Sequence, residues 1–120
     1  MNKKTLVLGA SLNSNKYSNM AINRIVDKKH SVRAIGGEDG EVRGVQIHSS
    51  KKIFQNIDTV TLYLNKNNQM DFYDYILDLN PRHVIFNPGS ENAELEKLLL
   101  KKSIFYEKAC ILVLLGINKY

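Results

Sequence analysis

Short apolar runs alternate along the chain with segments whose apolar positions recur at helical spacing. Runs of strand length, several of them rich in β-branched residues, predict strands at residues 5–8, 31–35, 44–47, 59–64 and 84–86. Helical spacing predicts helices at residues 18–28, 71–79 and 91–102. A short helical turn is expected from Ser49 or Ser50 to Phe54.

The ends of these elements carry their own signals. Ser18 is predicted to cap the first helix, and Asn87 or Ser90 the last one. Three glycines in the segment 36–40 predict a turn. The final apolar run, residues 110–115, has no polar position to give a helix a solvent-facing side. We therefore predict an interior strand there.

The alternation of strands and helices points to one fold class. Parallel strands joined by helices form a sheet with helices on both faces, since crossover connections are right-handed. We predict an α/β, three-layer Rossmann-like fold with a mainly parallel sheet of five to six strands. At 120 residues, a single domain over residues 1–120 is expected. Ligands of such sheets bind beyond the carboxyl ends of the strands, which places candidate loops after Leu8, Ile35, Leu64 and Phe86.

Net charge and the length of the apolar runs exclude some classes of binding partner and leave others open. The chain has 17 Lys and Arg against 12 Asp and Glu, a formal net charge of +5, so phosphates, nucleic acid and acidic lipid are all suitable partners. The lysine pairs are spread along the chain, which is not typical of a nucleic-acid interface. No apolar stretch approaches the ~20 residues needed to span a bilayer, and the first apolar run is too short for a signal peptide. We expect a soluble, cytoplasmic protein without a membrane partner.

Metal and nucleophile signals are weak. Cys110 is the single cysteine, so a disulfide within one chain is excluded, and one cysteine cannot by itself form a zinc site. A cysteine at the start of an apolar run is more often a small buried side chain than a nucleophile. The three histidines have no metal-like spacing. We predict neither a metal site nor a recognisable catalytic group.

The turn after the first strand is a candidate site for an anion. It lacks the full G-x-G-x-x-G of dinucleotide-binding folds. Gly9 would let a ligand approach the backbone, and Lys16 adds positive charge. Ser11 and Asn13 offer hydrogen bonds, and the helix start near Ser18 presents free amides to a phosphate. A tight turn with nothing bound is the alternative.

Three further segments lie at the ends of strands on the same edge. Gly36 and Gly37 stand where an NAD enzyme offers Asp or Glu to the ribose, which disfavours bound NAD. Tyr63, near the end of its strand, is a candidate to flank an adenine. The loop at residues 87–92 is more polar than a simple turn requires, and both ligand contact and helix capping remain open for it.

Several stretches together resemble a known family. They are TLVLGAS at residues 5–11, YSNMA at 17–21, GEV at 40–42 with Gly44-Val45, TVTLYLN at 59–65, Asn87-Pro88-Gly89, and Ala109-Cys110 with residues 112–115. In this order and spacing the chain resembles, nearly end to end, the small stand-alone coenzyme A (CoA)-binding proteins of bacteria. These are relatives of the CoA-binding domain of succinyl-CoA synthetase. The resemblance implies a Rossmann-like fold that binds CoA, acyl-CoA or a related adenine nucleotide as its cofactor.

The resemblance also implies which residues bind. The phosphates would be held by Gly9, Ala10, Ser11, Asn13, Lys16 and Ser18. The nucleotide pocket would be lined by Gly36, Tyr63 and Leu64 and closed by Asn87 and Gly89. The chain departs from many relatives in having Ser14 for a proline, Gly36-Gly37 for Asn-Pro, and Leu64 for an arginine.

Three functional hypotheses follow. The leading one is non-catalytic binding of CoA or an acyl-CoA in the cleft at the carboxyl ends of the strands. The first alternative is an enzyme dependent on NAD(P) or another nucleotide, with Cys110 or Tyr63 as its reactive group. The second is an interaction subunit with a vestigial cleft, which forms a homodimer through the final strand or an edge of the sheet.

Overall fold

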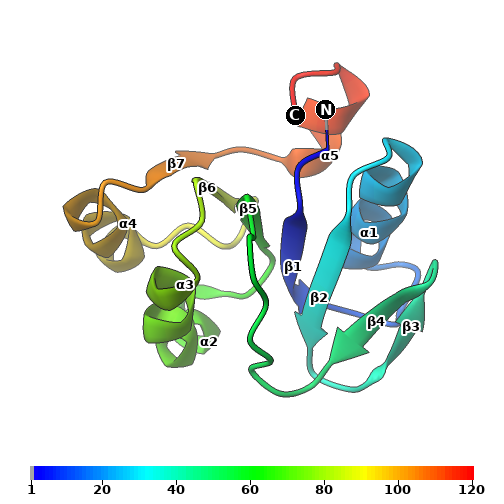
Figure 1. Cartoon of the computed structure of the whole chain (residues 1–120), viewed down its shortest axis with the longest axis horizontal. Helices are drawn as coiled ribbons and strands as arrows, with labels where there is room; N and C mark the ends of the chain where they lie inside the picture. The colour runs from blue at the N-terminus through cyan, green and yellow to red at the C-terminus, as the bar shows by residue number, and fades with distance from the viewer. Residues whose placement is uncertain (1) are drawn as a thin grey trace.

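A seven-stranded sheet lies between two layers of helices in the computed structural model, which describes residues 2–120 (Figure 1). The strands are β1 (Thr5–Ala10), β2 (Val32–Gly36), β3 (Gly40–Val42), β4 (Val45–His48), β5 (Thr59–Leu62), β6 (His83–Phe86) and β7 (Phe105–Lys108). The helices are α1 (Tyr17–Asp27), α2 (Lys66–Gln69), α3 (Tyr73–Leu79), α4 (Ala93–Lys101) and α5 (Ile111–Gly116), with a 3₁₀ turn, η1 (Met70–Phe72), before α3. Within residues 2–120, every helix is too short or too polar to cross a bilayer.

The sheet is mainly parallel. Its strands lie in the order β3-β4-β2-β1-β5-β6-β7. All neighbours are parallel except β3 and β4, which form a hairpin at one edge. The predicted three-layer, Rossmann-like α/β fold is therefore confirmed, although the sheet has seven strands instead of the five to six expected.

Alternation along the strands divides the core between the two faces of the sheet. Leu6 and Leu8 of β1 pack in one cluster with α3 and α4, whereas Val7 packs with α1 and α5. Figure 1 shows α2, α3 and α4 on one side of the sheet and α1 on the other. All three β1 side chains are fully buried, because a parallel strand in the middle of such a sheet is covered on both faces.

The prediction of a strand at residues 110–115 is wrong, because most of this run forms the helix α5. Ile111 and Leu115 lie about one helical turn apart and are buried in the cluster that contains α1, while Val113 is exposed. An apolar residue thus occupies the solvent-facing position, where a polar one would have signalled a helix. The seventh strand, β7, precedes α5 at the sheet edge. Its sequence is half charged and Phe105 is 62% exposed, so it lacks the pattern of a buried strand.

Helix capping also differs from the sequence-based expectation. The N-cap of α1 is Lys16, which makes no side-chain hydrogen bond, and Ser18 lies inside the helix. The N-cap of α4 is Asn92, whose Oδ1 accepts from the second and third amides of that helix at 3.1 and 3.3 Å. Asn87 and Ser90 therefore do not cap α4; each makes other hydrogen bonds instead.

The segment between β4 and β5 contains no helix, so the predicted turn ending at Phe54 is also wrong. The Tyr75 hydroxyl donates to the Lys52 carbonyl, and Lys4 Nζ donates to the Gln55 carbonyl at 2.7 Å. Both carbonyls thus accept from side chains outside the segment. The segment is thereby held against α3 without regular structure.

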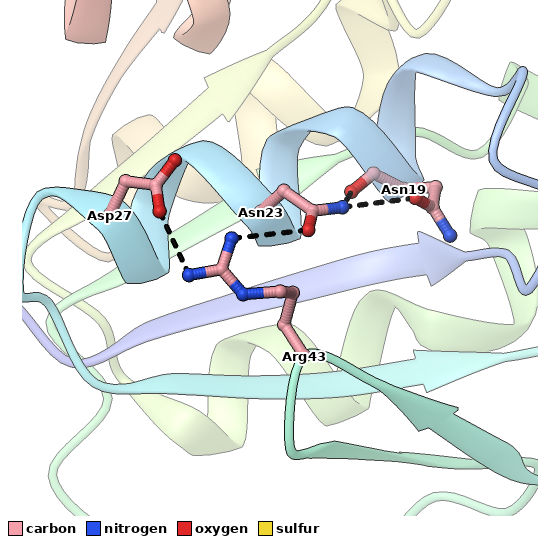
Figure 2. Close-up of polar contacts among 4 residues, drawn as sticks. All are labelled: Asn19, Asn23, Asp27 and Arg43. Carbon is pink, nitrogen blue, oxygen red and sulfur yellow. Dashed lines mark hydrogen bonds and ion pairs between the residues drawn. The ribbon is translucent and has the colours of Figure 1, made fainter.

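A polar ladder fastens the edge hairpin to α1 (Figure 2). Arg43, in the β3–β4 turn, donates to Asp27 Oδ1 at 2.8 Å and to Asn23 Oδ1 at 3.4 Å. Asn23 Nδ2 in turn donates to the Asn19 carbonyl and side-chain oxygens at 3.0 and 3.1 Å. Both members of the ion pair are about half exposed, so we ascribe to it the orientation of the hairpin and little of the stability.

Two neighbouring glycines, Gly36 at the end of β2 and Gly37 directly after it, provide a test of the packing at this end of the sheet. A Cβ on Gly36 would lie 2.2 Å from the Ala10 carbonyl oxygen, whereas one on Gly37 would meet no atom within 4 Å. We expect Gly36→Ala to lower the free energy of unfolding by about 1–3 kcal/mol, because the backbone must shift. Gly37→Ala is the matched control and should change it by less than ~0.5 kcal/mol. Urea denaturation measures both, and equal effects would contradict the close contact at Gly36.

Candidate functional site

The order of the strands reverses between β1 and β5, the position at which doubly wound sheets bind ligands. Gly9 lies there with a φ of 100°, a conformation that residues with a side chain rarely adopt. A Cβ on Gly9 would lie 2.9 Å from the carbonyl carbon of Tyr63 and 3.1 Å from the amide nitrogen of Leu64. The close contact between the ends of β1 and β5 is therefore sufficient reason for a glycine at position 9, whether or not a ligand approaches.

The loop between β1 and α1 is held by its own hydrogen bonds. Ser11 Oγ accepts from the Asn13 amide at 3.0 Å, and Asn13 Oδ1 accepts from the Asn15 amide at 2.9 Å. Asn19 Nδ2, on α1, donates to the Ser11 carbonyl at 2.9 Å. Lys16 is exposed at the start of α1 and does not cap it. A positively charged residue thus occupies the N-cap position at the partly positive amino end of the helix.

Two pockets open at this edge of the sheet. The first, here called the Leu64 pocket, has a volume of about 220 Å³ and is lined by Leu8, Gly9, Ile35, Gly36, Gly37, Leu64, Asn68, Asp71 and Phe72. The second, here called the Tyr63 pocket, has a volume of about 310 Å³ and is lined by Tyr17, Tyr63, Asn87, Pro88 and Cys110. Successive residues of an extended chain point to opposite faces of a sheet, so Tyr63 and Leu64 line different pockets.

The Tyr63 hydroxyl is buried and has no hydrogen-bond partner among residues 2–120. Burial, and to a smaller extent the nearby Cys110, raise the pKa of this hydroxyl above its ordinary value. The group therefore stays protonated at neutral pH. It is a hydrogen-bond donor without an acceptor, and it is buried although other atoms of Tyr63 line the pocket.

Asn87 ties three elements together beside the Tyr63 pocket. It is fully buried, and its Nδ2 donates to Thr61 Oγ1 at 2.6 Å and to the Leu62 carbonyl at 2.9 Å. Its Oδ1 accepts from the Ile111 amide, at the start of α5, at 2.9 Å. Because both N–H donors are already used, Asn87 shapes the wall of the pocket and has no donor left for a ligand.

A second buried amide, which the sequence analysis missed, joins α2 to the loop before α4. Gln69 Nε2 donates to the Leu64 and Ser90 carbonyls at 2.8 and 2.7 Å, and its Oε1 accepts from Asn92 Nδ2 at 2.9 Å. Asn92 stands directly before the acidic first turn of α4, a capping signal that is readable in the sequence. Gln69 follows a run of polar residues at 65–68, and nothing in that pattern indicates burial.

The predicted binding residues gather at the carboxyl edge but do not line one cleft. Gly9, Gly36 and Leu64 line the Leu64 pocket, while Tyr63 and Asn87 line the Tyr63 pocket. The remaining predicted residues lie at the end of β1 (Ala10), in the first turn of α1 (Ser18), or in the loops after β1 and β6 (Ser11, Asn13, Lys16 and Gly89). Gly89 has a φ of 93°, and its amide donates to Glu91 Oε1 at 2.9 Å. The binding roles of all these residues stay predictions.

Two larger hollows lie away from this edge. Their volumes are about 390 and 410 Å³; one borders Ile53 and α3, and the other lies around Asp58 and His83 at the amino ends of β5 and β6. Neither lies at the reversal of strand order, where sheets of this kind bind ligands. Within residues 2–120, no group of three or more His, Cys, Asp or Glu side chains is placed to hold a metal ion.

The sequence matches the protein family described as CoA binding domain over residues 3–116. The chain belongs to this family. The resemblance to CoA-binding proteins drawn from the sequence is thus confirmed. No curated protein matches the sequence.

Several solved structures are similar to this CoA-binding domain in fold, and they differ in how similar they are in sequence. A protein described only as uncharacterized is 42% identical, with a TM-score of 0.96 and coverage of 100% of this chain and 99% of its own. A Thermus thermophilus protein, cell-free ID.343, is 20% identical, with a TM-score of 0.87 and coverage of 99% and 91%. The dinucleotide forming acetyl-coenzyme A synthetase 1 of Ca. Korarchaeum cryptofilum, solved with phosphate and ADP, is 16% identical, with a TM-score of 0.67 and coverage of 84% and 23%. The last two likenesses show a shared fold.

Substitution of Asn87 tests whether its bonds hold this edge of the CoA-binding domain together. Asn87→Ala removes three hydrogen bonds and leaves the Ile111 amide without its partner. We expect the free energy of unfolding to fall by roughly 2–4 kcal/mol. Asn67→Ala, at an exposed position of α2, is the control and should shift it by less than ~0.5 kcal/mol. A loss at Asn87 as small as that of the control, measured by urea denaturation, would show that the bonds do not stabilise the fold.

Proposed function

We propose that the protein binds CoA or an acyl-CoA, without transforming it, at the carboxyl edge of the sheet. The family match over residues 3–116 carries this proposal. The position of the two pockets at the reversal of strand order supports it. The residues that line these pockets include one carboxylate, Asp71, and no histidine. Asp71 lines one pocket, whereas Tyr63 and Cys110 line the other, so no carboxylate or histidine accompanies Tyr63 or Cys110 in its pocket as a general base. This favours a binding role.

The loop between β1 and α1 is the proposed phosphate site. CoA is polyanionic, and the amino end of α1 together with exposed Lys16 offers it partial and full positive charge. The bonds within Ser11–Lys16 hold the loop in one shape before a ligand arrives, which reduces the ordering that binding requires. The residues proposed to surround the phosphates are Gly9, Ala10, Ser11, Asn13, Lys16 and Ser18.

The Leu64 pocket is the proposed site for the adenine and ribose. Phe72 offers an aromatic ring, and Asn68 and Asp71 offer hydrogen-bond acceptors to the amino group of a base. Gly36 and Leu64 complete the walls. The family resemblance implies these two residues together with Tyr63, which lines the other pocket. The Tyr63 pocket lies on the other face of the sheet.

Calorimetric titration of the purified protein tests the proposed ligand. CoA, acetyl-CoA, NAD, NADP and ATP are compared at one salt concentration, since binding of phosphates depends on salt. We expect one of the two CoA ligands to bind most tightly, with one site per chain. Tightest binding of NAD or NADP would support a nucleotide-dependent enzyme instead. Absence of binding by all five would support an interaction subunit.

Reversal of the charge at Lys16 tests the phosphate site. Lys16→Glu should weaken CoA binding about tenfold, as expected for loss of a charge-assisted contact of ~1.4 kcal/mol, with the melting profile of the free protein nearly unchanged. Lys97→Glu, at an exposed position of α4, makes the same change of net charge away from the loop and serves as the control. The site assignment fails if the two variants bind CoA equally well.

A further inference from the structure

The sheet ends on one side at β7, whose outer side is open. β7 is the last strand in the sheet order, and it pairs with β6. The Ala109 amide, directly after β7, donates to the Phe86 carbonyl at 3.1 Å. Because the main-chain groups of an extended chain point alternately to its two sides, Tyr106 and Lys108 direct their amides and carbonyls away from β6. Among residues 2–120, no strand pairs with these outward groups.

The two faces of β7 carry different side chains. Tyr106 packs against the core cluster on the side of α3 and α4, with its ring centroid 6.0 Å from that of Phe86. Side chains alternate along a strand, so Lys108 shares this face. Phe105 lies on the other face, with its ring centroid 4.9 Å from that of His83, and it is 62% exposed. A strand added outside β7 would therefore have a cationic neighbour on one face and an apolar neighbour on the other.

The charge along this margin is mainly positive. Lys101 and Lys102 lie at the end of α4, which covers the face that carries Lys108, and all three lysines are exposed. The acidic residues of α4 lie at its other end, in the first turn. The carboxylate of β7, Glu107, belongs to the opposite face, where its Oε2 lies 2.7 Å from His83 Nε2. Acidic side chains on the α4 face of an added strand would therefore meet complementary charge.

The same charges disfavour a second copy of this chain as the added strand. A dimer with two-fold symmetry would pair the two β7 strands antiparallel. Depending on the register, this pairing places Glu107 opposite its own counterpart or brings Lys108 close to the counterpart of Lys102. Like charges directly opposite each other destabilise a pair of strands. A segment of opposite charge avoids this repulsion.

We infer that the outer side of β7 binds an extended acidic segment of a partner protein, which adds to the seven-stranded sheet as a further strand through the main-chain groups of Tyr106 and Lys108. Acidic residues of the segment lie beside Lys108 and the lysines at the end of α4, and the apolar residues that alternate with them pack against Phe105. In strand addition the main-chain bonds contribute affinity and the alternating side chains contribute specificity. β7 lines neither pocket at the carboxyl edge, so this inference does not depend on the binding of CoA.

Fluorescence anisotropy with a labelled, capped heptapeptide of alternating Glu and Val tests the inference on the full chain. We expect saturable binding with one peptide per chain. A peptide of alternating Lys and Val is the control and should bind roughly tenfold more weakly, because its charges repel the lysines of this margin. Equal binding of the two peptides, or no binding of the acidic one at millimolar concentration, would overturn the inference.

Hydrogen exchange followed by NMR identifies the main-chain groups that bind. The acidic peptide should slow exchange of the Tyr106 and Lys108 amides, because these donors gain acceptors. Amides of the β3–β4 hairpin, at the other margin of the sheet, are the control and should exchange as before. Bound peptide that leaves exchange at Tyr106 and Lys108 unchanged would show attachment by charge alone and overturn the inference.

Lys108→Pro tests the edge by substitution, with Lys108→Ala as the matched control. Both remove the charge, but proline also removes an amide that points away from β6, a position where edge strands tolerate it. We expect Lys108→Ala to weaken binding of the acidic peptide about threefold, as for one exposed ion pair. Lys108→Pro should weaken it by roughly a further fivefold, as for one lost hydrogen bond, with the melting profile of the free protein nearly unchanged.

Two results with these variants would overturn the inference. Equal weakening by Lys108→Pro and Lys108→Ala would show that the outward amide is not used. Sedimentation that shows a dimer of the unaltered chain, dissociated by Lys108→Pro, would show that a second copy occupies the edge. The exchange measurement on the unaltered protein tests the same contact without any substitution.

Discussion

The close approach of Gly9 to the Tyr63–Leu64 peptide is the constraint on which the carboxyl edge of the sheet depends. The Tyr63 amide donates to the Leu8 carbonyl at 2.8 Å, which carries the pairing of β1 with β5 past the end of β5. The chain can continue into the β1–α1 loop because Gly9 takes a φ of 100° and has no Cβ. Tyr63 and Leu64, which directly follow β5, point their side chains to opposite faces of the sheet. The alternation of Tyr63 and Leu64 directly after this contact separates the Tyr63 pocket from the Leu64 pocket.

The two sides of this edge are stabilised differently. On the β5 and β6 side, the buried amides of Asn87 and Gln69 connect strands, α2, α5 and the loop before α4. On the β1 side, the loop from Ser11 to Lys16 closes on itself through short-range bonds. Removal of a buried amide therefore disturbs several elements, whereas a change at Lys16 stays local. Within the proposed phosphate site, Lys16 is therefore a position where a substitution disturbs the fold little, in contrast to Gly9.

Much of the fold was predictable because the central strands and the longer helices carry strong periodic patterns. β1 and β5 are buried on both faces, and α1 has an apolar side that is evident from its spacing. The failures have local physical causes. α5 exposes Val113, and β7 is a half-charged edge strand, so in each the pattern of apolar residues does not match the burial.

The candidate site was predictable in position and less so in detail. The rule that ligands bind beyond the carboxyl ends of strands located its loops. The contact at Gly9 and the three bonds of Asn87 join residues far apart in the chain, so no local pattern could show them. A glycine that serves a contact between strands cannot be told by sequence from one that serves a ligand, and Gly36 and Gly37 differ only in what surrounds them.

The hairpin fastened by Arg43 also determines where the sheet stops. Its outer strand, β3, has three residues and runs against the direction of its neighbour, and the ladder of Figure 2 holds it against α1. An edge this short offers few unpaired backbone groups to a strand from another molecule. The hairpin thereby limits growth of the sheet at that margin and protects the protein there against edge-to-edge aggregation.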